Sequence, residues 1–403
     1  MLPSPDRAAG LLRLAEFAPH MGADYAQNRN FDGGPGLRQV SGLSAHLRHR
    51  LITESEAVGT ALALHGAKAA EKFIQEVFWR SYWKGFLELR PAMWTEYRLR
   101  ALAEHERLNG SAALHAAMAG ETGIACFDAW ARELIETGWL HNHARMWFAS
   151  IWIFTLRLPW VLGAEFFLAH LADADAASNT LSWRWVAGIQ TPGKHYLARA
   201  ENIARFTQGR FHPKGELDED ALAIAEPGPP PALPLPRSDM MPAGRVALLL
   251  HEDDVGFWPE EAEGAEGAEV VAVASLVPSA ARGLFGQGGR AAAFSGGALA
   301  DGVGAAALRA QLTPAQVTSG GLAIWARGQG VRQIVTPWLP VGCAAEAISE
   351  ANAACVAEGV TILRLRRPWD GACWPLASKG FFPFRENIPR IIAQLRPAPP
   401  AEQ

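Results

Sequence analysis

The chain has 403 residues, which is enough for two or three domains and a large buried core. Its formal net charge is -4, which excludes an overall positive field of the kind that attracts nucleic acid, although a local basic groove is compatible with it. The four cysteines show neither a C-x-x-C pair nor the spacing of a zinc or iron–sulfur site, so we expect free thiols, no metal ion and a reducing compartment.

The N-terminal segment MLPSPDRAAG lacks the apolar core of a secretory signal. Further along, Arg157 and Pro159 interrupt the most apolar predicted helix, which argues against a membrane span. These features predict a cytoplasmic protein that does not cross a membrane. They leave the oligomeric state open, and we expect a monomer.

Residues 19–53 are predicted to form a loop followed by a helix. The loop NRNFDGGPG is rich in turn-forming residues, and LRQVSGLSAHLRHRLIT follows it as the helix. Ser41 and Ser44 stand near the start of this helix, where small hydroxyls and free amides can bind an anion. A serine pair before a helix is more often a simple cap, so the pattern alone leaves both interpretations open.

Residues 67–89 are predicted to form a strongly periodic helix. Glu76, Trp79, Arg80 and Trp83 fall on one stripe of it, at i, i+3, i+4 and i+7. The glutamate and the arginine could face a pocket, or they could form an ordinary i,i+4 surface pair. The helical segment 91–122 that follows carries little site chemistry.

Residues 137–188 contain six tryptophans around a few polar side chains. His141, Asn142 and Arg145 are predicted to project from one side of a helix that ends near Pro159. A set of polar groups inside an indole-rich wall suggests a pocket for a large planar ligand. Tryptophan stripes at helical spacing are also common in protein cores, and buried Arg–Asp pairs are often structural.

Asp173 and Asp175 lie two residues apart and therefore cannot share one helix face. They fit a tight turn that caps the helix carrying SNTLSWRW. The segment DADAASN also imitates the start of a calcium loop. Ser178 replaces the turn glycine of such a loop and Arg184 replaces its closing glutamate, so calcium is not expected.

Residues 213–244 are rich in proline and acidic residues and predict an extended linker. Beyond it, RVALLL, EVVAVASL, RQIVTPW and VTILRLRRPW are typical of buried strands, and Ala-rich segments between them are typical of helices. This alternation predicts a parallel α/β sheet over residues 245–396. The glycine-rich segments there do not form a clean G-x-G-x-x-G motif after a strand.

Residues 137–188 closely resemble the flavin-binding helical domain of the photolyase and cryptochrome family, whose pattern is roughly TGW-x-HN-x-x-RM…W…D-x-D-x-x-x-N-x-x-x-W-x-W. The resemblance extends over residues 1–212, because Glu76, Trp79 and Arg80 match the family's E/Q-x-x-W-R segment and Asp128 and Arg132 match a later one. The positions in register are Thr137, Gly138, Trp139, His141, Asn142, Arg145, Met146, Trp160, Asp173, Asp175, Asn179, Trp183 and Trp185.

The resemblance implies that FAD is the cofactor. Ser41, Leu43 and Ser44 match the family's G-T-S-x-L-S segment, which holds the flavin pyrophosphate, while Gln39 and Val40 replace its Gly-Thr. The residues that the resemblance assigns to flavin binding are Tyr25, Ser41, Leu43, Ser44, Arg80, Asn142, Arg145, Asp173, Asp175 and Asn179.

The resemblance also implies an activity, in which reduced flavin excited by blue light donates an electron to a pyrimidine dimer in DNA, the dimer splits, and the electron returns. Asn179 would lie beside the flavin N5, and Trp183 and Trp160 match the inner members of the family's tryptophan chain. The outer member has no matched tryptophan, and Trp94 and Tyr97 are both candidates for it. The residues assigned to the reaction are Asn179, Trp183, Trp160 and Glu76.

The implied substrate is UV-damaged DNA. Trp79 and Trp185 would stack on an extruded dimer, as in base flipping. Asn142 and Met146 are similar to the branch that repairs cyclobutane dimers, whereas the branch for the other photoproduct favours histidine there. The residues assigned to the substrate cavity are Glu76, Trp79, Asn142, Met146 and Trp185.

Three functions remain open at this stage. The first is a light-driven DNA photolyase, and the second is a cryptochrome-like photoreceptor without repair activity. The second draws support from His143, which replaces an arginine that meets DNA phosphate in the family, and from a segment around Tyr196 that departs from the family pattern. The third is a flavin-binding relic without photochemistry, against which the matched Asn179, Trp160 and Trp183 count.

The second predicted domain faintly resembles the antenna-type α/β domain of photolyases, at LLLHEDDVG and WPLASKGFFPFRENIPRII. In the family that domain precedes the helical one, so the order here would be permuted. The prediction is thus an all-helical FAD-binding domain (residues 1–212), a linker (213–244) and a parallel-sheet, Rossmann-like α/β domain (245–396). The sequence does not identify an antenna chromophore.

Overall fold

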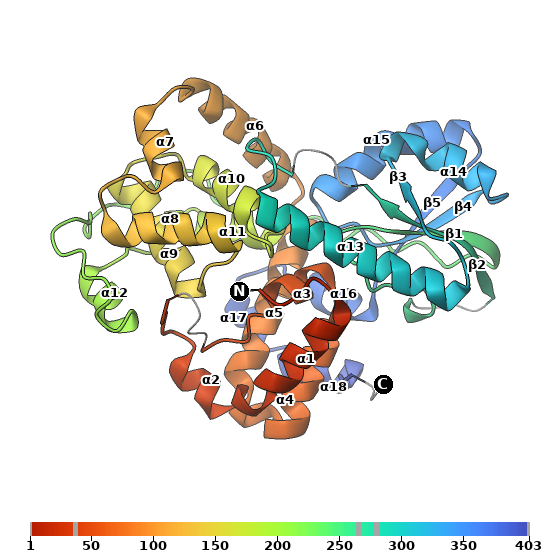
Figure 1. Cartoon of the computed structure of the whole chain (residues 1–403), viewed down its shortest axis with the longest axis horizontal. Coiled ribbons are helices and arrows are strands. Elements are labelled where there is room, and N and C mark those ends of the chain that lie inside the picture. Colours follow the sequence, from red (N-terminus) through yellow and green to blue (C-terminus); the bar gives the residue numbers. More distant parts are fainter. Residues whose placement is uncertain (1, 35–38, 263–266, 278–281, 401–403) are drawn as a thin grey trace.

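The structure is a computed structural model that describes residues 2–34, 39–262, 267–277 and 282–400. Its N-terminal half is helical and its C-terminal half contains one sheet (Figure 1). The helices of the first half are α1 (Arg7–Phe17), α2 (Ala23–Asn28), α3 (Ser44–His49), α4 (Glu54–Ala69), α5 (Glu71–Glu88), α6 (Ala92–Arg107), α7 (Ala112–Ala119), α8 (Ala125–Thr137), α9 (Asn142–Ser150), α10 (Trp160–His170), α11 (Ala176–Ala187) and α12 (Ala200–Phe206).

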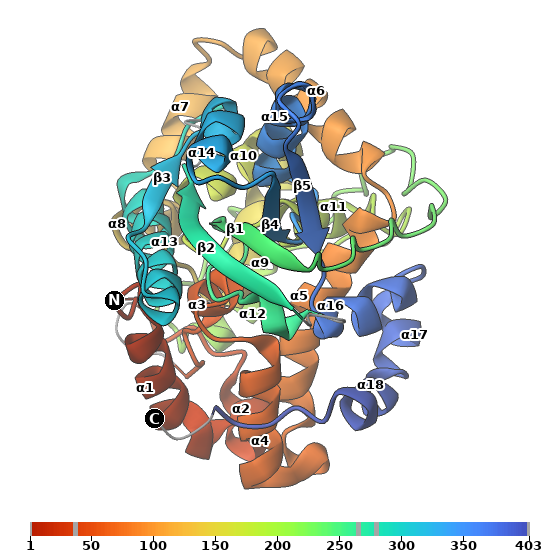
Figure 2. The same cartoon turned by 90° about the vertical axis from the view of Figure 1, so that its right-hand side faces the viewer.

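The second half begins with the sheet. Its strands are β1 (Gly244–Leu250), β2 (Ala268–Leu276), β3 (Ala315–Val317), β4 (Gln333–Pro337) and β5 (Thr361–Leu365), and its helices are α13 (Gly289–Ala310), α14 (Leu322–Gly328), α15 (Cys343–Ala357), α16 (Pro368–Cys373), α17 (Phe381–Arg385) and α18 (Ile388–Leu395). All strand pairs are parallel, in the order β3-β2-β1-β4-β5 (Figure 2). The predicted parallel sheet is therefore confirmed.

Helices cover both faces of the sheet. Along β1, Val246 and Leu248 pack with Phe294 and other residues of α13 on one face. Ala247 and Leu249 pack with α14 and α15 on the other face, because successive side chains of a strand point to opposite sides. The strand order reverses between β1 and β4, and ligands of open α/β sheets bind beside the carboxyl ends of the strands at such a point.

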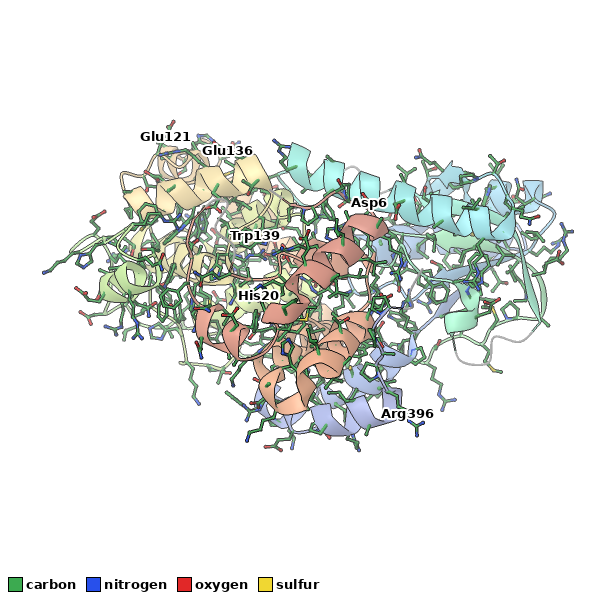
Figure 3. The ribbon with its side chains drawn as sticks, turned by 60° about the horizontal axis from the view of Figure 1, so that its bottom comes forward. Asp6, His20, Glu121, Glu136, Trp139 and Arg396 are labelled. Atoms are coloured by element: carbon green, nitrogen blue, oxygen red, sulfur yellow. The ribbon has the colours of Figure 1, made fainter. Side chains whose placement is uncertain are left out.

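Helix α13 joins the two halves of the molecule. Its first turn lies beside Glu136 of α8 (Figure 3), where Arg290 Nε donates to the Glu136 carbonyl at 2.9 Å. By length and composition α13 is apolar enough to span a membrane, and half of that stretch is buried inside the protein. Since it packs against β2 and the helical half, we assign it to the core.

Several predicted boundaries were wrong. The helix predicted for residues 37–53 is confined to α3, and α2 lies within the predicted loop, while residues 35–38 fall outside the described ranges. The helix predicted for 67–89 is α5, which begins at Glu71. Residues 67–69 belong to α4, but they follow a kink at Gly66, whose φ is +70°. The short strand β3 was not predicted.

The C-terminal segment returns to the helical half. Trp369 Nε1 donates to Ser81 Oγ at 2.8 Å, and α17 and α18 lie beside α5 and α4 in both views (Figures 1 and 2). After α18 the chain crosses α4 so closely that a Cβ at Gly59 would lie 2.2 Å from the carbonyl carbon of Ala398. Helix α5 is thus enclosed by elements from both ends of the chain.

Candidate functional site

A buried charge cluster lies where α5, α9 and the α10–α11 loop meet. Arg145 Nη2 donates to Asp173 Oδ2 at 2.9 Å, and Arg80 pairs with Asp175 and lies 3.8 Å from Asp173 Oδ2. Asp175 is the N-cap of α11, as its spacing predicted, because its Oδ1 accepts from Ser178 N at 2.7 Å. Two arginines from separate helices therefore meet both carboxylates of one loop.

The two carboxylates are ionised. Burial would raise the pKa of each, but neighbouring cations outweigh it and lower both pKa values. For Asp173 these are Arg145 and Arg80, and for Asp175 they are Arg80 and Lys84. Removing one partner from such a buried cluster leaves a charge without compensation.

The cluster has capacity for a polar ligand. Asp173 Oδ1 and the nearby Ser44 Oγ are both buried and form no hydrogen bond of regular geometry within the described residues, although the Ser44 hydroxyl contributes to the lowered pKa of Asp173. Buried polar atoms without partners are rare, because each costs about 1–3 kcal/mol. A carboxylate that accepts N–H donors, beside two guanidinium groups, suits the hydrogen-bonding edge and the phosphates of FAD.

The sequence did not indicate a role for Lys84, and it placed His141 incorrectly. Lys84 is 2% exposed and its Nζ has no hydrogen-bond partner among the described residues. Its signal was its position four residues after Arg80. His141 was predicted within the helix, but it is the N-cap of α9, and its Nδ1 accepts from the backbone N–H of His143 at 3.2 Å.

The Glu76–Arg80 surface pair considered from the sequence does not form. Glu76 instead forms an ion pair with Arg29 at the end of α2, while Arg80 forms an ion pair with Asp175. The two side chains of one helical stripe therefore bind two different loops. Local spacing did not reveal this, because both partners come from distant segments.

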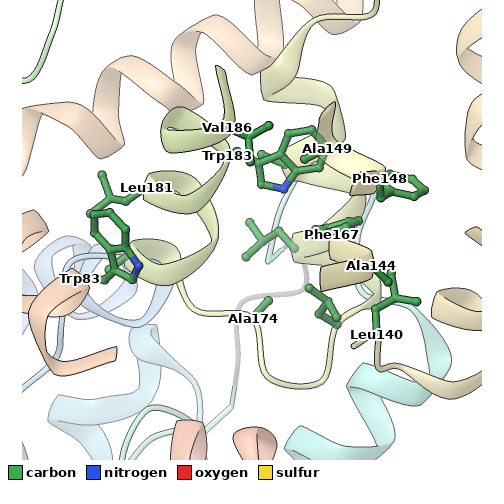
Figure 4. Close-up of a cluster of buried hydrophobic side chains, with 14 of the residues drawn as sticks. Trp83, Leu140, Ala144, Phe148, Ala149, Phe167, Ala174, Leu181, Trp183 and Val186 are labelled. Atoms are coloured by element: carbon green, nitrogen blue, oxygen red, sulfur yellow. The ribbon is translucent and has the colours of Figure 1, made fainter. Parts of the chain in front are cut away.

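The predicted tryptophan pair, Trp160 and Trp183, is buried in the core of the helical half. Trp183 packs edge-on to Phe167, with ring centroids 5.1 Å apart, and Phe148, Phe167 and Val186 surround it (Figure 4). Gly163 makes room for this ring, since a Cβ there would lie only 2.3 Å from it. Trp160 begins the same helix as Gly163, so the two tryptophans adjoin one helix face.

Two further aromatic rings extend from Trp160. Tyr97 stacks on Trp160 with centroids 5.8 Å apart, and Trp94 lies 5.3 Å from Tyr97. Trp94 Nε1 donates to Glu346 Oε1 of α15 at 2.8 Å. The two candidates for the outer member therefore lie in series beside Trp160.

The remaining predicted residues lie around these two groups. Asn179 is buried and its Nδ2 donates to the Ala164 carbonyl at 2.8 Å. Asn142 is exposed at the start of α9, with its Nδ2 3.9 Å from Met146 Sδ. Trp185 is 37% exposed and stacks on Tyr196 at 5.8 Å.

Tyr25 lies in α2, and Ser41 and Leu43 lie just before α3. Tyr25 packs edge-on to Phe73 at 5.4 Å, and Leu43 is fully buried. The Ser41 carbonyl accepts from Arg13 Nε at 2.7 Å, so α1 holds this segment in place. Ser44 is the first residue of α3.

A separate cleft of about 530 Å³ lies between the two halves of the molecule. It is lined by the loop after β1, by the start of α4, by α13 and by α16. Phe257, Trp258 and Trp369 supply aromatic surface, and Arg50 and Arg367 supply charge. Both arginines are held by Asp254, whose pKa they lower despite its burial.

Comparison with known proteins gives consistent findings. Residues 73–217 match the family model described as the FAD binding domain of DNA photolyase. Curated relatives include the deoxyribodipyrimidine photo-lyase of Streptomyces griseus, 38% identical over 171 residues (42% of this chain, 36% of the relative), and that of Escherichia coli strain K12, 30% identical over 224 residues (53% and 45%). The chain spans about half the length or less of these curated relatives.

Solved structures give weaker matches. One is a bacterial class III photolyase from Agrobacterium tumefaciens, 24% identical with a TM-score of 0.41, covering 50% of this chain and 43% of that one. Another is a cryptochrome of Synechocystis sp. PCC6803, 23% identical with a TM-score of 0.42 and the same coverage. The family match contains the predicted site residues from Glu76 to Trp185, so the resemblance inferred from the motif is confirmed over residues 73–217.

Proposed function

We propose that this chain, whose residues 73–217 form a photolyase-type FAD-binding domain, is a light-driven photolyase that splits cyclobutane pyrimidine dimers in DNA. The observation that carries the proposal is the joint position of the charge cluster and the aromatic series. Arg145 and Asp173 pair at 2.9 Å next to the core that contains Trp183. A photolyase needs both a flavin site and a path for electrons to it.

The chemistry that FAD supplies when bound is the transfer of one electron to the dimer after absorption of blue light. The same electron returns once the dimer has opened. Arg80 and Arg145 would hold the cofactor, with Asp173 and Asp175 fixing their orientation and setting the local charge. Asn179 would donate or accept at the isoalloxazine edge. Such preorganised groups stabilise charge without reorganising during the reaction.

Trp79 and Trp185 would stack on the extruded dimer, while Glu76, Asn142 and Met146 would contact its polar edges. Stacking on an aromatic side chain contributes about 1–3 kcal/mol per base. Trp183 and Trp160 would carry electrons from an external reductant to the cofactor. The α/β domain at the C-terminus would be a photolyase antenna domain in permuted order, with a Rossmann-like fold.

The large cleft is the place where we would seek a second chromophore. Its volume of about 530 Å³ falls within the range of pockets for small ligands, about 300–1,000 Å³. It is also lined by the loops that follow β1 and β5. A pigment released by acid from the purified protein, and absent from a Trp258→Ala variant, would support this placement.

The test of the main proposal is a repair assay. The purified protein is loaded with FAD, reduced, mixed with dimer-containing oligothymidine and illuminated with blue light. Recovery of thymine absorbance in the light but not in the dark supports the photolyase. Bleaching of the flavin bands without that recovery supports the alternative, a cryptochrome-like photoreceptor, and failure to bind flavin overturns both.

A further inference from the structure

The C-terminal segment is fixed against α5, the helix that carries Trp79. Tyr82 Oη donates to the Lys379 carbonyl at 3.0 Å, and Arg90 Nη2 donates to the Ser378 carbonyl at 2.7 Å. Gly85 permits close approach, since a Cβ there would lie 2.7 Å from Trp374 Cα. Helix α17 is therefore held at one height along α5.

Phe381, the first residue of α17, lies flat against Trp79. Their ring centroids are 3.5 Å apart and their planes differ by 10°. The other rings near Trp79 are not parallel to it: Tyr82 is inclined by 82° and Trp83 by 38°, at 5.6 and 5.4 Å. Phe381 is buried and Trp79 is half-buried, so one face of the indole is covered while part of the ring reaches solvent.

We propose that Phe381 is a positioning residue for the dimer cavity: it holds the indole of Trp79 so that the other face of the indole stacks on the extruded dimer. The inference rests on the proposed function, which places Trp79 in that cavity. A side chain ordered before binding does not lose its rotamer freedom on binding. The benefit of Phe381 is therefore expected in affinity and not in the electron-transfer steps.

The test compares Phe381→Ala with Phe381→Tyr and with Phe382→Ala. Phe382 is the next residue on the same helix and is 68% exposed, so it is the matched control. An aromatic pair contributes about 0.5–1.5 kcal/mol beyond area burial, so Phe381→Ala should raise KM and Kd by about threefold to tenfold, with kcat unchanged. Phe381→Tyr should restore both constants, and Phe382→Ala should leave them unchanged.

The Kd is measured by fluorescence anisotropy of a labelled, dimer-containing oligothymidine in the dark, with thermal unfolding of each variant alongside. In a Trp79→Ala background, Phe381→Ala should have no further effect on Kd. An equal effect in both backgrounds, or lower stability with unchanged Kd, would assign Phe381 a structural role only and overturn the inference. If Trp79→Ala itself leaves Kd unchanged, the proposed cavity is wrong, and Phe381 loses its role with it.

Discussion

Tyr97 stacks on Trp160, with ring centroids 5.8 Å apart and 30° between the planes. Burial, reinforced by the neighbouring Glu165 carboxylate, raises the pKa of Tyr97, so its phenol stays protonated. An oxidised phenol must release its proton, and the side chain of Glu165 lies beside it. The structure thus places a tyrosine next to Trp160, where the sequence had left Tyr97 and Trp94 as alternatives.

We predict that Tyr97→Phe slows photoreduction of bound FAD by a thiol about tenfold, which corresponds to about 1.4 kcal/mol in the activation barrier. The substitution keeps the ring packing but removes the proton that an oxidised tyrosine can lose. The measurement is the rate of flavin bleaching under constant blue light. The control is Tyr82→Phe, because Tyr82 is also a buried tyrosine but lies on α5. Equal rates of photoreduction in the two variants would exclude Tyr97 from the electron path.

A second prediction concerns the Arg145–Asp173 ion pair. Asp173→Asn removes a buried charge that faces two guanidinium groups, and breaking such a pair costs about 3–5 kcal/mol. We expect the free energy of unfolding in urea to fall by that order and FAD to bind more weakly. Glu358→Gln, in an exposed pair with Arg327, should change stability by less than about 1 kcal/mol. Comparable losses in both variants would contradict the structural role of the cluster.

Features set by local spacing could be predicted from the sequence. The two-residue offset of Asp173 and Asp175 indicated a turn and a helix cap, and Asp175 is that cap. The apolar runs of the second half indicated the parallel sheet. In each case the signal lies in neighbouring residues of the chain, although the strands of the sheet then pair across distant segments.

Contacts between distant segments could not be predicted. Nothing near Glu76 indicated Arg29 as its partner, and nothing near Trp79 indicated Phe381. Helix starts were also misplaced, because three- and four-residue spacings do not show where a helix begins. The first turn of α9 was therefore predicted to include His141, although that residue caps it.

The capping role of His141 predicts a pH dependence. Its Nδ1 accepts from His143 N–H, so its Nε2 carries the proton and donates to the Arg29 carbonyl at 3.1 Å. Burial lowers the pKa of His141 to about 4, despite nearby Asp32. His141 therefore binds a proton more tightly in the unfolded chain, where a histidine has a pKa of about 6.5, than in the folded protein.

The contribution of His141 to stability is thus complete above about pH 6.5 and is lost as the pH falls toward 4. We expect His141→Asn, which can still cap α9 but does not titrate, to weaken the fall in stability over this interval. The measurement is urea unfolding of both proteins at pH 7.5 and pH 5. Parallel pH profiles would show that other groups control the transition.

The last prediction concerns Gly163, which lies against Trp183 in the interior of α10. A Cβ at this position would lie 2.3 Å from the Trp183 ring and 2.9 Å from Trp152 Nε1. Neither indole can retreat, because both are buried among packed aromatic rings. Overpacking of this kind typically costs about 1–3 kcal/mol.

We therefore expect Gly163→Ala to lower the free energy of unfolding by up to about 2 kcal/mol, because the gain of about 1 kcal/mol in helix propensity offsets only part of the overpacking cost. Gly296→Ala in α13, where a Cβ meets nothing within 4 Å, should instead raise it by up to about 1 kcal/mol. If the two substitutions change the free energy of unfolding in urea with opposite signs, steric contact with Trp183 outweighs helix propensity at position 163. A stabilised Gly163→Ala protein would mean that the Trp183 ring can move aside, which would contradict this prediction.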